Sequence, residues 1–373
     1  MKIDLDTRIV ESPAATEVYI SAVPDTTKPL AEQASDVFAG VRDRLESMQA
    51  RILQERVFST PEAAETLRAV RSKVYGDCDD GVSPSYLVSQ TPASCPFAGV
   101  QVHALAGVSD VEIVKLDGTP CGRVVRMADR THLALSAIAA DAGKSAADQA
   151  QEVFQKAESA LERFGADFLS VSRTWMWLGD ILSWYDDFNH VRTEFFRKRG
   201  LVGAGTRQSM PASTGIGLGP AAAGELSMDL VAVLEPKGAT DYLGALGRQQ
   251  CALEYGSAFS RASRAVTPAG KTVYVSGTAS IDAAGVTTNI GDAEAQIKTT
   301  IENVQAVLAD MDLGDKDVVQ TVAYSKTKDI EQLFEPFKQK LDWPWVSVVC
   351  DICRDDLLFE IEAAAMAGST RSD

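Results

Sequence analysis

The residues with the clearest chemical potential lie in the segment CDICRDDLLFEIE. Its last part, FEIE, alternates apolar and acidic residues, which is typical of a β-strand that places the carboxylates of Glu360 and Glu362 on one face. Arg354 stands a few residues earlier in the chain. A solvated strand face would produce this pattern without any function. An acid in a cleft beside a fixed cation would produce it for chemistry.

Glu360 would serve as a general acid if its face of the strand were closed. A carboxyl in an enclosed apolar site has a raised pKa because desolvation disfavours its charged form. Placing such an acid correctly contributes on the order of 10²–10⁴ in rate. For a carboxylate substrate, the planar guanidinium fork is the expected partner. Arg354, Arg261 and Arg173 are the candidates because each lies in a phrase that resembles a motif of a known enzyme family: CRDDLLFEIEA for Arg354, FSRA for Arg261 and RTW for Arg173. A surface ion pair is the alternative for each arginine.

Composition limits the classes of function. The 373 residues carry a net charge of −16, with 52 acidic and 36 basic residues, so we expect no nucleic-acid partner. The sequence begins MKIDLDTRIVESP, which is acidic where a signal peptide is apolar, and no apolar run is long enough for a bilayer. We therefore expect a cytoplasmic protein with no membrane partner. Cys350 and Cys353 form a CxxC without a second pair or a histidine cluster, so we predict no metal site and no cofactor.

Three segments of the chain follow one pattern, which indicates an internal repeat. Each opens with a β-like run (VYISAVPD, THLALSAIAAD or TVYVSGTASID) and continues into a helix that carries Gln33, Gln149 or Gln296 at the same place. A further β-like run, a second helix and an alternating apolar strand follow in each copy. The terminal strands align Gln101 and His103 with Ser227 and Asp229, and with Glu360 and Glu362, so only the third copy carries two glutamates after an arginine.

The repeat predicts an α+β fold of three tandem β-β-α-β-α-β-β modules, at residues 1–115, 125–238 and 250–370. Each sheet would cover one face with its own helices and the other with the neighbouring sheets. We therefore expect one chain to form an intramolecular pseudo-trimer around a pseudo-threefold axis. Whether two such monomeric pseudo-trimers pair is left open.

These modules resemble the Rid family (reactive intermediate deaminases, also called YjgF), whose members are homotrimers of such a module. The third module carries the resemblance in GTASID, in TIENVQAVL and in the ending with arginine followed by EIEA. In that family a strand arginine grips a substrate carboxylate in the cleft between subunits, and Arg354 stands at that position.

A more specific resemblance, to the chorismatases, covers roughly residues 165–368. It rests on RTW, MPASTGIG, EYG with FSRA, GTAS and CRDDLLFEIEA, which occur in this order. Chorismatases use a Rid-derived fold to remove the enolpyruvyl group of chorismate, and the first glutamate of EIE is their proton donor, which corresponds to Glu360. The chain departs from the family at Met176, where asparagine is typical, and in YGSAFSR, which lacks an arginine and two prolines.

The resemblance also implies a product type. Gly277 and Cys353 resemble the pairing in chorismatases that form 3-hydroxybenzoate, whereas enzymes that form the dihydroxy-cyclohexadiene acid carry alanine at both positions. Cys353 would then shape the product channel beside the catalytic acid.

Further ligand contacts are expected from MPASTGIG, a glycine-punctuated loop that can approach a small polar ligand closely. Ser213, Thr214 and Gly215 are its candidate residues, and Tyr255 is a candidate donor. The alternative for MPASTGIG is a tight connection between a helix and a strand. The alternative for Tyr255 is packing without a ligand contact.

We therefore predict an enzyme that resembles the chorismatases and acts on a small-molecule carboxylate. A Rid-type enamine or imine hydrolase and a non-enzymatic pseudo-trimeric scaffold are the alternatives. A chorismatase requires a closed pocket with at least two cations facing Glu360. An imine hydrolase requires chiefly Arg354 and a water site, and a scaffold should have this cleft filled by side chains.

Overall fold

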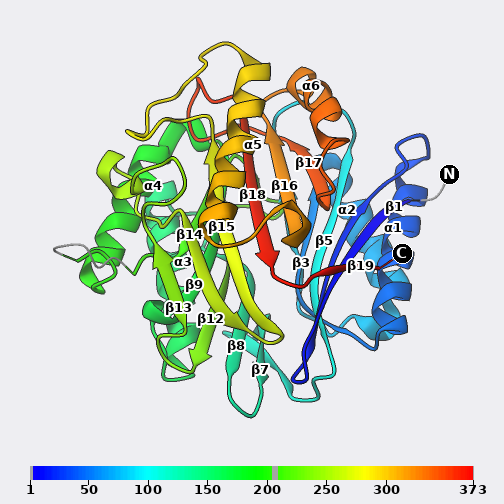
Figure 1. Cartoon of the computed structure of the whole chain (residues 1–373). Coiled ribbons are helices and arrows are strands. Elements are labelled where there is room, and N and C mark those ends of the chain that lie inside the picture. The colour runs from blue at the N-terminus through cyan, green and yellow to red at the C-terminus, as the bar shows by residue number, and fades with distance from the viewer. Residues whose placement is uncertain (1–2, 204–208, 373) are drawn as a thin grey trace.

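The computed structural model describes residues 3–203 and 209–372, which form three mixed β-sheets with helices at the periphery (Figure 1). The first sheet has the order β11-β4-β3-β5-β2-β1-β19. Its strands are β1 (Asp4–Glu11), β2 (Thr16–Val23), β3 (Arg51–Ser59), β4 (Ser85–Val88), β5 (Phe97–Ala106), β11 (Gly219–Pro220) and β19 (Thr370–Ser372). Helices α1 (Leu30–Ser47) and α2 (Pro61–Tyr75) accompany it.

The second and third sheets repeat this arrangement, with the orders β10-β9-β12-β8-β7-β6 and β13-β14-β15-β18-β16-β17. The second contains β6 (Val111–Leu116), β7 (Thr119–Arg126), β8 (Thr131–Ala139), β9 (Val171–Leu178), β10 (Ala212–Ile216) and β12 (Leu226–Glu235), with α3 (Ala146–Glu162) and α4 (Ile181–Lys198). The third contains β13 (Thr240–Leu243), β14 (Ala262–Thr267), β15 (Gly270–Ala279), β16 (Val318–Ser325), β17 (Trp345–Val349) and β18 (Phe359–Met366), with α5 (Ala293–Asp310) and α6 (Lys328–Lys338).

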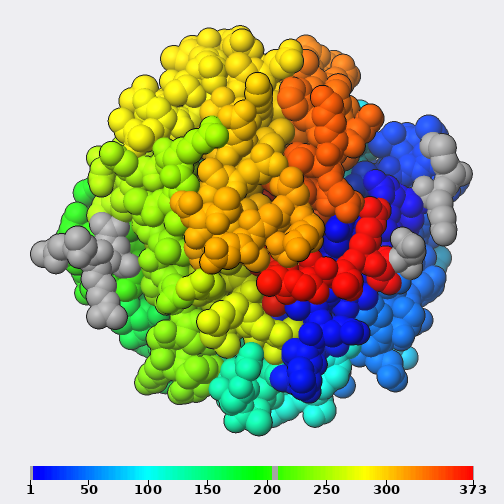
Figure 2. Space-filling view, viewed as in Figure 1, coloured from blue at the N-terminus to red at the C-terminus, as the bar shows by residue number. Residues whose placement is uncertain are grey.

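The predicted α+β class with three Rid-like modules in one chain is confirmed. The proposed module bounds remain a prediction. Two sheet edges draw on distant parts of the chain: β11 pairs with β4, and β19 pairs with β1. Figure 2 shows the C-terminal residues (red) lying across the N-terminal strands (blue).

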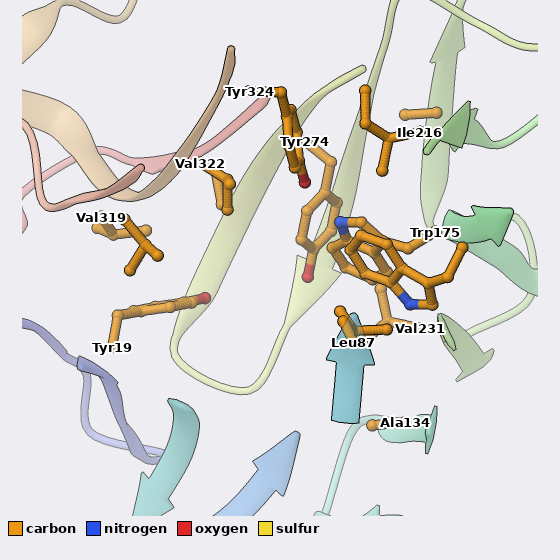
Figure 3. Close-up of a cluster of buried hydrophobic side chains, with 14 of the residues drawn as sticks. Tyr19, Leu87, Ala134, Trp175, Ile216, Val231, Tyr274, Val319, Val322 and Tyr324 are labelled. Carbon is orange, nitrogen blue, oxygen red and sulfur yellow. The ribbon is translucent and has the colours of Figure 1, made fainter. Parts of the chain in front are cut away.

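The apolar core is divided in the way that three stacked modules require. Three clusters of buried side chains each fill the space between one sheet and its own helices. The fourth combines inner-face residues of all three sheets, among them Tyr19, Trp175 and Tyr274 (Figure 3). Each sheet is therefore covered on one face by its helices and on the other by its neighbours.

Two of the three repeated glutamines share one structural task. Gln149 and Gln296 are buried at the starts of α3 and α5, and the Oε1 atom of each accepts a backbone N–H from the loop before the terminal strand. Gln296 accepts from Leu358 at 2.8 Å and donates through Nε2 to the Asp356 carbonyl at 2.9 Å. This repeat residue therefore fixes the backbone immediately before Glu360.

Charged side chains on the inner faces are paired across modules. Asp229 on β12 accepts from Arg56 Nε on β3 at 3.0 Å and from the Ala137 backbone N–H on β8 at 2.8 Å. His103 on β5 contacts Glu17 Oε2 at 2.9 Å, and the same carboxylate accepts from the Ala269 backbone N–H of the third module at 2.8 Å.

Among the described residues, no helix has both the length and the apolar character needed to cross a membrane.

We expect Asp229→Ala to lower the free energy of unfolding by about 3–5 kcal/mol, because it leaves the buried Arg56 guanidinium without its carboxylate. Glu112→Ala is the matched control, since its pair with Arg126 is exposed, and the expected change is within about 1 kcal/mol. Urea unfolding monitored by circular dichroism measures both. Equal effects of the two variants would contradict the prediction.

Candidate active site

A cavity of about 50 Å³ lies where the second sheet meets the third. Eight of the ten predicted site residues line it: Ser213, Gly215, Tyr255, Arg261, Gly277, Cys353, Arg354 and Glu360. They come from β10, from β15, from β18 and from the segments before β14 and β18.

Glu360 lies on β18 between β15 and β16, opposite Ala279 and Tyr324, and is 4% exposed. Burial raises the pKa of this carboxyl to about 8, and the nearby Glu362 contributes to the rise, while three arginines partly oppose it. The side chain is therefore predominantly protonated at neutral pH. The sequence did not decide whether the strand face that carries Glu360 is solvated, and the structure shows that this face is buried.

The space for this carboxyl depends on Gly277. The pairing of β15 with β18 is irregular between Val275 and Thr278, so Gly277 lies in a β-bulge. A Cβ atom added at Gly277 would collide with Glu360 Oε1 and would lie 3.3 Å from Thr214 Cγ2. Glycine is thus required for the observed position of the acid.

Two of the predicted arginines are held in the cavity wall by backbone carbonyls. Arg261 donates through Nε to the Gln250 carbonyl at 2.9 Å and through Nη2 to the Tyr255 hydroxyl at 2.5 Å. Arg354 donates through Nη1 to the Gly285 carbonyl at 2.7 Å. The Tyr255 ring lies 5.2 Å from the Arg261 guanidinium and 5.4 Å from that of Arg354, so it contacts both cations.

A third arginine of the cavity, Arg192 on α4, was not predicted. It is 1% exposed, donates through Nη2 to Asn189 Oδ1 at 2.6 Å and packs against the rings of Phe188 and Phe259. Its Nε has no protein partner within the described part of the chain. The sequence contained one indication that Arg192 is buried. It falls on the apolar stripe of the helix, together with Phe188 and Phe195.

The remaining lining residues were also missed: Tyr185, Ser257, Phe259, Ala279, Ile281 and Leu357. Tyr185 lies within hydrogen-bonding reach of the Cys353 thiol. Burial, with the nearby Glu360, raises the pKa of Cys353 to about 12, so this thiol is neutral and poorly suited to act as a nucleophile.

Arg173 and Thr214 do not line the cavity. Arg173 is buried behind it, where Nη2 donates to Glu362 Oε2 at 2.8 Å and to the Thr214 hydroxyl. The structure therefore places the third predicted arginine on a carboxylate of the protein itself.

An open groove adjoins the cavity and shares Tyr185, Tyr255, Ser257, Cys353 and Arg354 with it. The cavity and the groove thus share one wall. Within residues 3–203 and 209–372, no three His, Cys, Asp or Glu side chains are grouped as a metal ion would require.

Comparison with known proteins agrees with this architecture. Residues 255–367 match the family model described as Endoribonuclease L-PSP. A solved chorismatase structure superposes with a TM-score of 0.63 at 18% identity, covering 85% of this chain and 93% of that one. The fold is thus that of a chorismatase, with an L-PSP-type module at its C-terminal end.

Sequence comparison adds one curated relative, 3-hydroxybenzoate synthase of Streptomyces hygroscopicus. It is 28% identical in an alignment of length 233 that covers 55% of this chain and 66% of the relative. The alignment thus spans slightly less than two thirds of that protein. The predicted resemblance to the chorismatases within the Rid superfamily is confirmed.

We expect Gly277→Ala to displace the Glu360 carboxyl by roughly 1 Å, because carbon and oxygen atoms return to an ordinary contact of about 3.5 Å. Crystal structures of the variant and the wild type measure this shift. Gly314→Ala is the control, since an added Cβ there meets no atom within 4 Å. An unmoved Glu360 in Gly277→Ala would show that the strand yields instead.

Proposed function

We propose that this protein removes the enolpyruvyl group of chorismate, or of a close analogue, as pyruvate and leaves 3-hydroxybenzoate. The observation that carries the proposal is a buried carboxyl, protonated at neutral pH, in a cavity with three arginines. An enol ether is cleaved after a proton is added to its terminal methylene carbon, and this step needs such an acid.

The cations provide the second part of the argument. Chorismate carries two carboxylates, and Arg192, Arg261 and Arg354 line the cavity together with Glu360. Arg261 and Arg354 are each held by a backbone carbonyl, so their guanidinium groups are oriented before a substrate arrives. Arg192, whose Nε has no protein partner in the described chain, has donor capacity left for a carboxylate.

The reaction then follows from these positions. Glu360 gives its proton to the methylene carbon, and an oxocarbenium ion forms, which water or a neighbouring hydroxyl attacks. When the ring aromatises, pyruvate and 3-hydroxybenzoate together contain all the atoms of chorismate, and no water is consumed. Hydrolysis would instead consume one water and give the dihydroxy-cyclohexadiene acid. Gly277 and Cys353 border the acid, and their types in the resembling enzymes support the aromatic product. The proposal requires no metal and no organic cofactor.

The alternatives make different demands on the same cleft. A scaffold should have the cleft filled by side chains, whereas here Glu360 and three arginines line a cavity of about 50 Å³. An imine hydrolase requires chiefly Arg354 and has no evident use for a buried protonated glutamate.

We expect the purified protein to release pyruvate and 3-hydroxybenzoate from chorismate. Glu360→Gln should lower kcat on the order of 10²–10⁴-fold, because the amide cannot donate the proton. Coupled pyruvate detection and chromatography of the aromatic product measure the two activities. Glu112→Gln, an exposed substitution on β6, is the control. If the wild type releases no pyruvate, the proposal fails and imines become the compounds to test.

The proposal predicts whether kcat rises or falls with pH. Because Glu360 must be protonated to act as an acid, kcat should fall as pH rises through about 8, its pKa in the folded chain. A profile of kcat between pH 6 and 10, read as pyruvate release, should show this descending limb, and the residual activity of Glu360→Gln should lack it. An increase of kcat through the same region would instead assign Glu360 as a base.

A further inference from the structure

Glu362 is buried beside Glu360 and is bound by two side chains of the second module. It is 5% exposed and accepts from Arg173 Nη2 at 2.8 Å and from Trp175 Nε1 at 2.9 Å. Trp175 belongs to the core shared by the three sheets (Figure 3), and the Arg56 guanidinium lies 3.7 Å from its ring centroid. Glu362 therefore has one fixed orientation.

The same contacts reach the cavity wall. Arg173 Nη2 also donates to the Thr214 hydroxyl, and the Thr214 methyl group borders the space over Gly277 that the Glu360 carboxyl occupies. Arg173 thus joins β18 to β10 directly behind the acid. Because Glu360 and Glu362 are two residues apart on one strand, their Cα atoms are roughly 6.6 Å apart and their side chains share a face.

The charged and titratable groups around Glu360 come from its own strand and from the elements packed against it. Glu362 shares its strand, Tyr324 lies opposite it on β16 and Arg173 lies on β9. The other groups are Arg192 and Tyr185 on α4, Tyr255 and Arg261 before β14, and Cys350, Cys353 and Arg354 before β18. Glu362 is the carboxylate among them, and its influence on Glu360 exceeds that of any single arginine.

We propose that Glu362 is a positioning residue whose negative charge adds to burial in favouring the acid form of Glu360, and that Arg173 and Trp175 act by holding Glu362 in place. This inference rests on the proposed function for its catalytic meaning. It assigns Arg173 a place behind the substrate cavity rather than a contact with the substrate.

The second module provides a natural comparison. Asp229 occupies the position of Glu362 on its own terminal strand and is likewise buried and paired with an arginine, Arg56. Two residues earlier stands Ser227 instead of a glutamate. A similar ion pair is thus present without an acid to tune. Because Arg56 also packs on Trp175, the matched control is taken from the first module, where the buried Glu55 carboxylate accepts from Arg71.

The decisive experiment is a titration of Glu360 by carbon NMR on protein labelled with glutamate enriched in ¹³C at the carboxyl carbon. Loss of one resonance in Glu360→Gln assigns the signal. Glu362→Gln keeps the shape of the side chain and its acceptor oxygen but removes the charge. We expect the Glu360 midpoint to move to lower pH by about one to two units, from Coulomb's law at an effective dielectric constant of about 20. Glu55→Gln, which removes a buried carboxylate paired with Arg71 in the first module, should leave it unchanged.

The activity profile supplies a second readout. In Glu362→Gln the descending limb of kcat should move to lower pH by the same amount, while kcat at acidic pH stays close to that of the wild type. A merely structural role would lower activity at all pH values and leave the limb in place. An unmoved Glu360 midpoint in folded Glu362→Gln overturns the inference.

One further variant keeps the test open if Glu362→Gln fails to fold. The double variant Glu362→Gln/Arg173→Gln leaves no unpaired charge, and its Glu360 midpoint should move down by a smaller amount. An unmoved or raised midpoint overturns the inference. Because NMR reads Glu360 directly, a wild type that releases no pyruvate defeats the proposed function but not the titration result. An unmoved midpoint with active wild type defeats only the role of Glu362.

Discussion

The structure depends on the burial of one face of each sheet against the other two sheets. Any polar side chain on these faces leaves water when the modules assemble, and a buried charge without a partner is strongly destabilising. Asp229 therefore meets Arg56, and Glu362 meets Arg173, across module boundaries. The pairing of inner-face charges fixes how the three modules face one another, and the cavity is a result of that placement.

Because the three modules belong to one chain, their terminal strands can carry different residues at equivalent positions. At the position of Glu360 the first module has Gln101, which donates to the Thr321 carbonyl at 2.9 Å, and the second has the small Ser227. In the third module the same position holds an acid beside a cavity. A homotrimer, whose three clefts are identical by symmetry, could not combine structural contacts in two clefts with chemistry in one.

The sequence allowed the repeat, the strand of Glu360 and most of the cavity lining to be predicted, because these depend on local patterns and on phrases that recur along the chain. It did not show whether the cleft was closed, since closure depends on Tyr185 and Arg192, which a distant helix contributes. Arg173 was assigned to the substrate for the same reason. Its partner Glu362 lies 189 residues away, and no local pattern links the two.

The buried acid also ties folding to the uptake of a proton. The Glu360 carboxyl has an ordinary pKa of 4.5 when exposed in the unfolded chain and a pKa of about 8 when folded. Between these values the native chain retains a proton that the unfolded chain releases, so the free energy of unfolding declines as pH rises through this interval. The residue that equips the cavity for acid catalysis therefore weakens the native state at neutral pH, where the folded chain holds this proton and the unfolded chain has released it.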